Sequence, residues 1–260
     1  MGVKAHLAFI KEIYKVELAA AMAYRFNFLT QSVGMFINDM FWVLFWFLFF
    51  QKFVDVNGWG FHEIVLLHAV FATGFGLAGV LFTHYRHIAS YVEEGRLDYY
   101  LTMPKNVLLY TILGFGYSDF GDLVFGLTMA LFAVSLWQWP LFLFLSLMSM
   151  IVFMSFTIAL MSITFFVGRF EKAAKTGRNI MQTFAFYPFS AYKGTTRFVL
   201  LFIIPSGFVA GIPVELLTTF SWPWLFITIA VALGFSLLAI ILFYTGLRKY
   251  ESGNVMAMRG

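Results

Sequence analysis

The feature of this sequence that most restricts its fold is a set of six long apolar stretches that contain no Lys or Arg. Each stretch is long enough to cross ~30 Å of hydrocarbon as a helix. Their apolar residues run continuously instead of alternating, which favours helices over a membrane-spanning barrel. We therefore expect an all-α polytopic membrane protein with six transmembrane helices at residues 28–50, 64–83, 108–131, 141–167, 198–217 and 224–247.

The composition supports this assignment and excludes several functions. Of the 260 residues, 61% are hydrophobic and only 12% are charged, which is far from the composition of a soluble domain. The spans leave little room for a globular unit, so residues 1–260 are expected to form a single transmembrane domain. Cysteine is absent, which excludes disulfides and thiolate chemistry. The basic residues form no continuous module, so we expect no nucleic-acid partner.

The distribution of basic residues predicts the orientation. With an even number of spans, both termini and every second connection lie on the same side of the membrane. All of the 17 Lys and Arg residues except Lys52 lie on that side. The positive-inside rule assigns that side to the cytoplasm. We expect both termini, the 84–107 connection and the 168–197 connection to be cytoplasmic.

The first 27 residues are expected to form a helix that lies along the cytoplasmic membrane interface. Phe9, Ile13 and Val16 recur at helical spacing, while Lys11 and Lys15 occupy another face. The alternative is a simple extension of the first span.

The fifth apolar stretch is irregular. Pro205 and Pro213 fall in or near it, and proline removes a backbone donor and kinks helices. We expect short re-entrant helices at the outer face before the sixth span. A kinked span followed by an ordinary loop is the alternative.

Three aspartates lie near the middle of the first and third predicted spans. Asp39, Asp119 and Asp122 have no Lys or Arg in any span to neutralise them, and an ionised carboxylate in hydrocarbon is costly. They either line a translocation path or form hydrogen bonds between helices or subunits. His84 and His87 lack a third ligand nearby in the sequence, so no metal site is expected.

Glycine-rich motifs give no nucleotide site. Residues 74–79 match Gly-x-Gly-x-x-Gly, but they lie inside an apolar span, where small residues let helices approach closely. No Gly-x-x-x-x-Gly-Lys-Ser/Thr loop occurs in the chain, so any ATP must be bound by a partner.

The 84–107 connection is expected to be structured. Gly95 follows Glu94 as a C-terminal helix glycine, and a second short helix can run from Arg96 until Pro104 stops it. Such a small amphipathic element can lie on the membrane or fit a groove on a soluble partner.

The segment Glu94–Pro104 resembles the G-x-L-D-x-x-L-x-x-P element between the second and third spans of ABC type-2 permeases. Later segments are similar to landmarks of a bacterial subfamily in the same order, namely Asp119-Phe120-Gly121-Asp122, Tyr187-Pro188 with Tyr192, and residues 202–213.

This resemblance implies the permease subunit of an exporter in the bacterial plasma (inner) membrane. Two such subunits, identical or homologous, would act with two cytoplasmic ABC ATPase subunits that hold ATP and Mg. The permease itself would carry no catalytic residue and no cofactor, and it would contact membrane lipid. The residues implied in ATPase coupling are Gly95, Arg96, Leu97, Asp98, Tyr99, Tyr100 and Leu101. The alternative function is an ion- or proton-coupled secondary transporter that uses Asp39, Asp119 and Asp122.

Overall fold

The computed structural model describes residues 3–103 and 106–251, and every regular element in these ranges is a helix. Pro104, the expected helix stop, lies outside the described residues. Four helices, taken with their flanking turns, are long and apolar enough to cross a membrane. They are α2 (Arg25–Phe50), α3 (Phe61–Phe82), α8 (Trp139–Ser162) and α13 (Trp222–Leu247).

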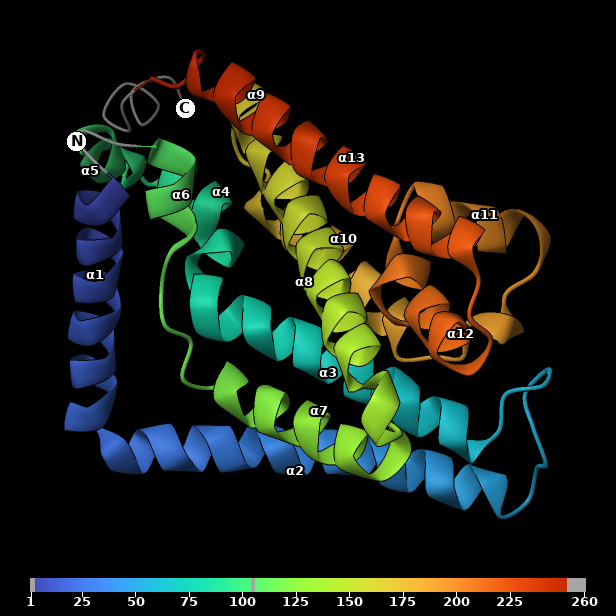
Figure 1. Ribbon diagram of the computed structural model, residues 1–260. Helices are drawn as coiled ribbons and strands as arrows, with labels where there is room; N and C mark the ends of the chain where they lie inside the picture. The colour runs from blue at the N-terminus through green and yellow to red at the C-terminus, as the bar shows by residue number, and fades with distance from the viewer. Residues whose placement is uncertain (1–2, 104–105, 252–260) are drawn as a thin grey trace.

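Helices α3 and α8 form the centre of the bundle (Figure 1). α3 packs against α8 and against α7 (Asp119–Ala133), while α2 covers α7 and α13 covers α8. The apolar windows of α3 and α8 are 72% and 61% buried, against 11% for α2 and 17% for α13. The two outer helices therefore present apolar side chains that suit a lipid environment.

The N-terminal segment is a separate helix, α1 (Val3–Ala23), that meets α2 at a sharp bend at Tyr24 (Figure 1). It is therefore not an extension of the first span. Two side chains tie α1 to the bundle: the Tyr14 hydroxyl donates to the Leu81 carbonyl, and the Glu17 carboxylate accepts from the Phe115 amide. We retain its position at the interface as an expectation.

The third apolar stretch is broken, so the expectation of one helix over residues 108–131 is wrong. α6 (Val107–Ile112) and α7 are joined by an irregular segment at residues 113–118. Exposed backbone is very costly in a membrane, but here other segments supply hydrogen-bond partners. The bonds are Thr83 N to Gly114 O (3.3 Å), Phe115 N to the Glu17 carboxylate, Gly116 N to Gly79 O (3.1 Å) and Ser32 Oγ to Tyr117 O (2.7 Å).

The segment 168–197 does not stay at one end of the bundle, contrary to expectation. After the short helix α9 (Thr164–Val167), α10 (Glu171–Ala185) packs along α8. Its first residues contact Glu93, beyond the C-terminal end of α3. Beyond its last turn, Ser190 Oγ donates to Val56 O (2.7 Å) in the connection between α2 and α3. Because the two contacts lie at opposite ends of α3, α10 and the residues after it run the length of the bundle.

The fifth apolar stretch is not a straight helix. It forms α11 (Gly194–Phe202), followed by the π-helical η4 (Gly207–Gly211) and α12 (Ile212–Thr218). The chain bends by 77° between α11 and the η4–α12 pair. Pro205 lies in the break, as its missing donor and steric bulk predict. The irregularity expected for this stretch is therefore present, and its re-entrant placement stays a prediction. The remaining short turns are η2 (Leu136–Gln138) and η3 (Phe189–Ala191).

Candidate functional site

The segment that follows α3 folds into three short helical pieces. These are η1 (Thr83–His87), α4 (Ile88–Glu93) and α5 (Leu97–Leu101). Gly95 separates α4 from α5 with a φ of +71°, in the left-handed region where only glycine avoids a steric penalty. The predicted helix, C-terminal glycine and second short helix are thus present, and they form what we call the coupling segment, residues 83–103.

The coupling segment presents a preorganised outer surface. Arg96, Tyr99 and Leu101 are exposed. Arg96 Nε lies 2.7 Å from a Glu94 carboxylate oxygen, and its guanidinium carbon lies 5.0 Å from the centre of the Tyr91 ring. A cleft of about 330 Å³ is lined by Tyr91, Gly95, Arg96, Tyr99 and Tyr100. Aromatic and arginine side chains around a cleft are the composition that protein interfaces favour.

Leu97 and Asp98 face the protein itself. Leu97 is fully buried in the core cluster, so the expectation that it contacts a partner is wrong, and it anchors α5 to the bundle instead. Asp98 is partly buried beside Tyr250, just after α13. Burial, followed by the contact with Asp98, raises the pKa of the Tyr250 hydroxyl. The inward side of α5 is thus attached to the last helix of the chain.

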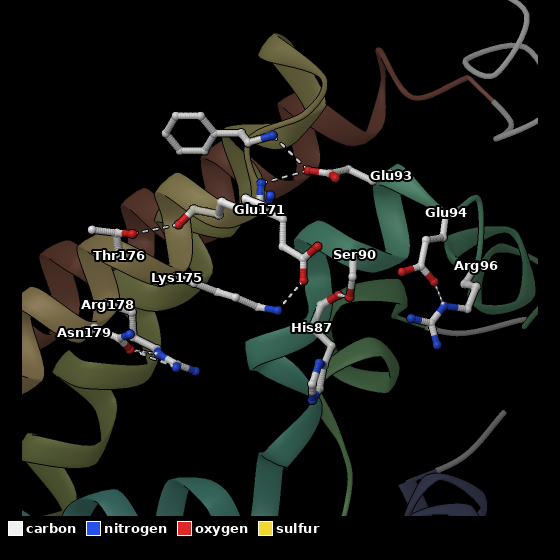
Figure 2. Close-up of polar contacts among 12 residues, drawn as sticks. His87, Ser90, Glu93, Glu94, Arg96, Glu171, Lys175, Thr176, Arg178 and Asn179 are labelled. Carbon is white, nitrogen blue, oxygen red and sulfur yellow. Dashed lines mark hydrogen bonds and ion pairs between the residues drawn. The ribbon is translucent and has the colours of Figure 1, made fainter. Parts of the chain in front are cut away.

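Glu93 joins the coupling segment to α10. One oxygen of its carboxylate accepts hydrogen bonds from the backbone amides of Phe170 and Glu171, each at 2.8 Å (Figure 2). The first amides of a helix lack partners within the helix and carry partial positive charge, so a carboxylate is well placed there. Glu93 therefore fixes the start of α10 against the end of α4.

Arg86 reaches Asp119, although we expected no cation near the predicted span carboxylates. The distance from Arg86 Nη2 to Asp119 Oδ1 is 2.7 Å, and only 16% and 4% of the two side chains is exposed. The guanidinium carbon also lies 4.7 Å from the centre of the Phe75 ring. Arg86 lies just beyond the predicted second span, and its long side chain extends back along the apolar surface. That reach is what the linear sequence did not reveal.

Asp39 on α2 and Asp122 on α7 form a second carboxyl contact. Both are buried, and their side chains are hydrogen-bonded to each other. Two carboxyl groups in contact must retain at least one proton, because like charges so close cannot both ionise. The Asp119 carboxylate and the Arg86 guanidinium lie within electrostatic reach of Asp122. The structure thus brings all three predicted aspartates into one cluster.

Glycines make room for this cluster. A Cβ atom on Gly79 would overlap the Asp119 side chain, and one on Gly116 would lie 2.5 Å from Asp119 Oδ2. At Gly76 a Cβ would lie 2.5 Å from the backbone nitrogen of Leu123 on α7. The packing role predicted for the 74–79 glycines is confirmed.

The predicted site residues did not include any residue of α10, which carries one further cation inside the bundle. Arg178 is partly buried, and its Nε and Nη2 donate to the side-chain oxygen of Asn179 at 3.3 and 3.0 Å. The Arg86 guanidinium lies within electrostatic reach of Arg178. The sequence signal was the alternation of polar and apolar residues at helical spacing over Glu171–Ala185, which suits a helix with one buried face.

Comparison with known proteins identifies one family. The family described as ABC-2 family transporter protein matches residues 36–254, which is most of the chain. Comparisons with curated proteins and with solved structures give no match.

Proposed function

Because the chain belongs to the ABC-2 family of transporter proteins, we propose that it is the membrane-spanning permease subunit of an ATP-driven exporter. In this proposal a separate cytoplasmic ATPase binds and hydrolyses ATP with Mg. The permease converts the motion of that partner into movement of a substrate across the membrane. The sequence contains no phosphate-binding loop, which supports the assignment of ATP binding to a separate subunit.

The observation that carries this proposal is the two-sided construction of the coupling segment. Its outer side offers Arg96, Tyr99 and a cleft, while its inner side is attached to the bundle by the buried Leu97. An element of this kind can receive a partner on one face and transmit the partner's displacement through the other.

The attachments of the segment lead to different helices. Glu93 leads to α10, Asp98 leads to the end of α13, and η1 continues directly from α3. A push on the coupling segment would therefore move helices on both sides of α8. Rigid elements that share packed contacts carry such displacements because packed interiors deform little.

We further propose six membrane crossings in which α10 is the fifth. The crossings are α2, α3, the broken pair α6 and α7, α8, α10 and α13, and the bent segment 194–218 is re-entrant at the outer face. Both termini are then cytoplasmic, in the bacterial inner membrane. Lys193 and Arg197 join Lys52 outside, where Arg197 pairs with Glu215 at 3.6 Å. Most of the basic residues stay inside, as the positive-inside rule requires.

A second permease subunit, identical or homologous, completes the proposal. α10 exposes Lys172, Thr176, Asn179 and Thr183 along its length, and a membrane-crossing helix does not expose such a polar face to lipid. A facing subunit, or a water-filled path between two subunits, would cover it. A second permease subunit would provide the facing surface and would also form one wall of such a path.

The rival is a secondary transporter driven by protons or cations through Asp39, Asp119 and Asp122. The contact between the buried carboxyl groups of Asp39 and Asp122 is the observation that favours it. Against it, Arg86 already neutralises Asp119.

One experiment decides between the two functions. The tagged chain is expressed in a bacterial host together with its neighbouring genes, purified in mild detergent, and the co-purifying proteins are identified by mass spectrometry. We expect a stoichiometric ATPase with a phosphate-binding loop and ATP hydrolysis in the complex. Purification of an active transporter without any ATPase, dependent on a proton gradient, would establish the rival.

A further inference from the structure

In the part of the chain that the structure describes, Arg178 is a partly buried cation whose charge no ion pair balances. It lies two turns into α10, on the same side of the helix as the buried Ala174 and Met181. At 1.5 Å per residue, it is about 10 Å along α10 from the Glu171 amide that Glu93 holds. It therefore lies inside the bundle, towards the end that carries the coupling segment.

Other cations of this region have acidic partners. Arg86 pairs with Asp119 at 2.7 Å, and Lys175 pairs with Glu171 at 2.5 Å. In the described ranges 3–103 and 106–251, no carboxylate lies within ion-pair distance of Arg178. Asp119 acts on it electrostatically, but that carboxylate already binds Arg86, so the group of three carries one surplus positive charge.

The neighbouring Lys175 leaves this surplus unchanged, because its ammonium group pairs with the Glu171 carboxylate (Figure 2). Arg178 donates hydrogen bonds from Nε and Nη2 to the neutral side chain of Asn179. An arginine has five N–H donors, so this contact leaves donors free for another group.

An arginine in this position is expensive to keep without a function. Burial disfavours its charge, and positive neighbours disfavour it further. The cost is removed when an anion binds, because a guanidinium makes strong paired hydrogen bonds with phosphate and carboxylate oxygens.

We propose that Arg178 binds the anionic group of a transported amphiphile, a phosphate or a carboxylate, as it enters from the coupling-segment end. The inference rests on the proposed transport function and adds the chemical class of the substrate. The Arg86–Asp119 pair next to it holds the second guanidinium in place and contributes to the positive potential. The hydrophobic part of the ligand would lie along the apolar interior of the bundle.

The test measures binding directly and needs no ATPase. The full chain is placed in phosphatidylcholine nanodiscs and titrated by calorimetry with octyl phosphate and, separately, octyltrimethylammonium, with empty nanodiscs subtracted. We expect the phosphate probe to bind at least about tenfold more tightly than the ammonium probe, because only the phosphate can pair with the guanidinium.

The variants assign this preference to one residue. Arg178→Gln is expected to weaken octyl phosphate binding about tenfold, and Arg178→Lys, which keeps the charge but loses the paired hydrogen bonds, to weaken it about threefold. Arg25→Gln is the control, because Arg25 is an exposed cation outside α10, and it is expected to leave binding unchanged. The thermal unfolding midpoint of each variant reports whether it is folded. If Arg178→Gln does not fold, the comparison of Arg178→Lys with Arg25→Gln and the ratio of the two probes still decide the matter.

The source of the anion is tested by competition. Displacement of octyl phosphate by inorganic phosphate indicates a site for soluble anions, and displacement only when phosphatidylglycerol replaces phosphatidylcholine indicates a lipid headgroup. Equal binding of both probes, or wild-type binding by folded Arg178→Gln, overturns the inference. Failure of ATPase co-purification would refute the exporter and leave this binding result unchanged.

Discussion

Arg86 and Asp119 form a short ion pair, 2.7 Å from Nη2 to Oδ1, between η1, which directly follows α3, and the first turn of α7. The residues are far apart in sequence, and the pair closes the junction between two helices that share an extensive contact surface. A buried pair of this kind adds little stability overall, but the loss of one partner leaves an uncompensated charge.

Asp119→Ala is therefore expected to destabilise the protein by about 3–5 kcal/mol, the cost typical of breaking a buried pair. The double variant Arg86→Met with Asp119→Ala should recover part of that loss, because it also removes the stranded guanidinium. The unfolding midpoint in detergent measures both. A double variant less stable than Asp119→Ala alone would show that Arg86 stabilises the fold independently of this aspartate.

Glu93 and Glu94 are adjacent carboxylates with different contacts, so their alanine variants can be compared directly. Glu93→Ala removes the acceptor of two backbone amides and is expected to cost about 1–3 kcal/mol and to reduce ATP hydrolysis stimulated by the permease. Glu94→Ala breaks an ion pair in which both side chains are more than half exposed, and it should cost less than about 1 kcal/mol. Equal effects of the two substitutions would contradict the assigned connection to α10.

Tyr99 and Leu97 lie on opposite sides of α5, so their substitutions should affect different quantities. Tyr99→Ala should leave stability unchanged and reduce ATPase co-purification by about tenfold, the effect of losing a moderate interface contact. Leu97→Ala should instead lower stability by about 2–5 kcal/mol, because the side chain is fully buried. Val54→Ala, at a position that is 92% exposed at the other end of the bundle, is the control. Normal ATPase binding by Tyr99→Ala would remove α5 from the docking surface.

The crossing of α10 can be tested by cysteine labelling, since the chain has no cysteine of its own. In intact cells, an impermeant thiol reagent should modify Val54→Cys and Lys193→Cys and spare Glu94→Cys. If Lys193→Cys were protected while Val54→Cys reacted, α10 would not cross, and the 168–197 connection would be cytoplasmic after all.

Gly76 and Gly34 are both helical glycines, but only Gly76 lies in close contact with a neighbouring helix. Gly76→Ala should reduce stability by at least about 1–3 kcal/mol, because its Cβ would meet the backbone of Leu123 and α3 would have to move away from α7. A Cβ on Gly34 meets nothing within 4 Å, so Gly34→Ala should stabilise α2 by about 0.5–1 kcal/mol through helix propensity. The two unfolding midpoints, measured side by side, should shift in opposite directions.

The long apolar helices were predictable because hydropathy over about 20 residues reports directly on membrane burial. α2, α3, α8 and α13 overlap the stretches predicted for them. The same averaging failed for α10, since Glu171, Lys172, Lys175 and Arg178 lower its mean hydropathy although its other face packs on α8. Hydropathy measures composition, whereas burial of one face depends on neighbours that the linear sequence does not show.

The break in the third span was hidden for a related reason. Residues 113–118 contain no charged residue, and only Gly114 and Gly116 hinted at an irregular backbone. Of the candidate site, the coupling segment and the three aspartates were found from the sequence. The Arg86 ion pair, the Glu93 cap and Arg178 were not, because each depends on a contact between segments far apart in the chain.

The hydrogen bonds of the break also bear on how the chain is made. The partners of residues 114–117 belong to α1, α2 and the end of α3, and all of them precede the break in the chain. A ribosome therefore synthesises the partners before the residues that need them. The proposed third crossing can then enter the bilayer against a scaffold already inserted. A chain rearranged to begin at α6 would expose those backbone groups to lipid for as long as the earlier helices were missing.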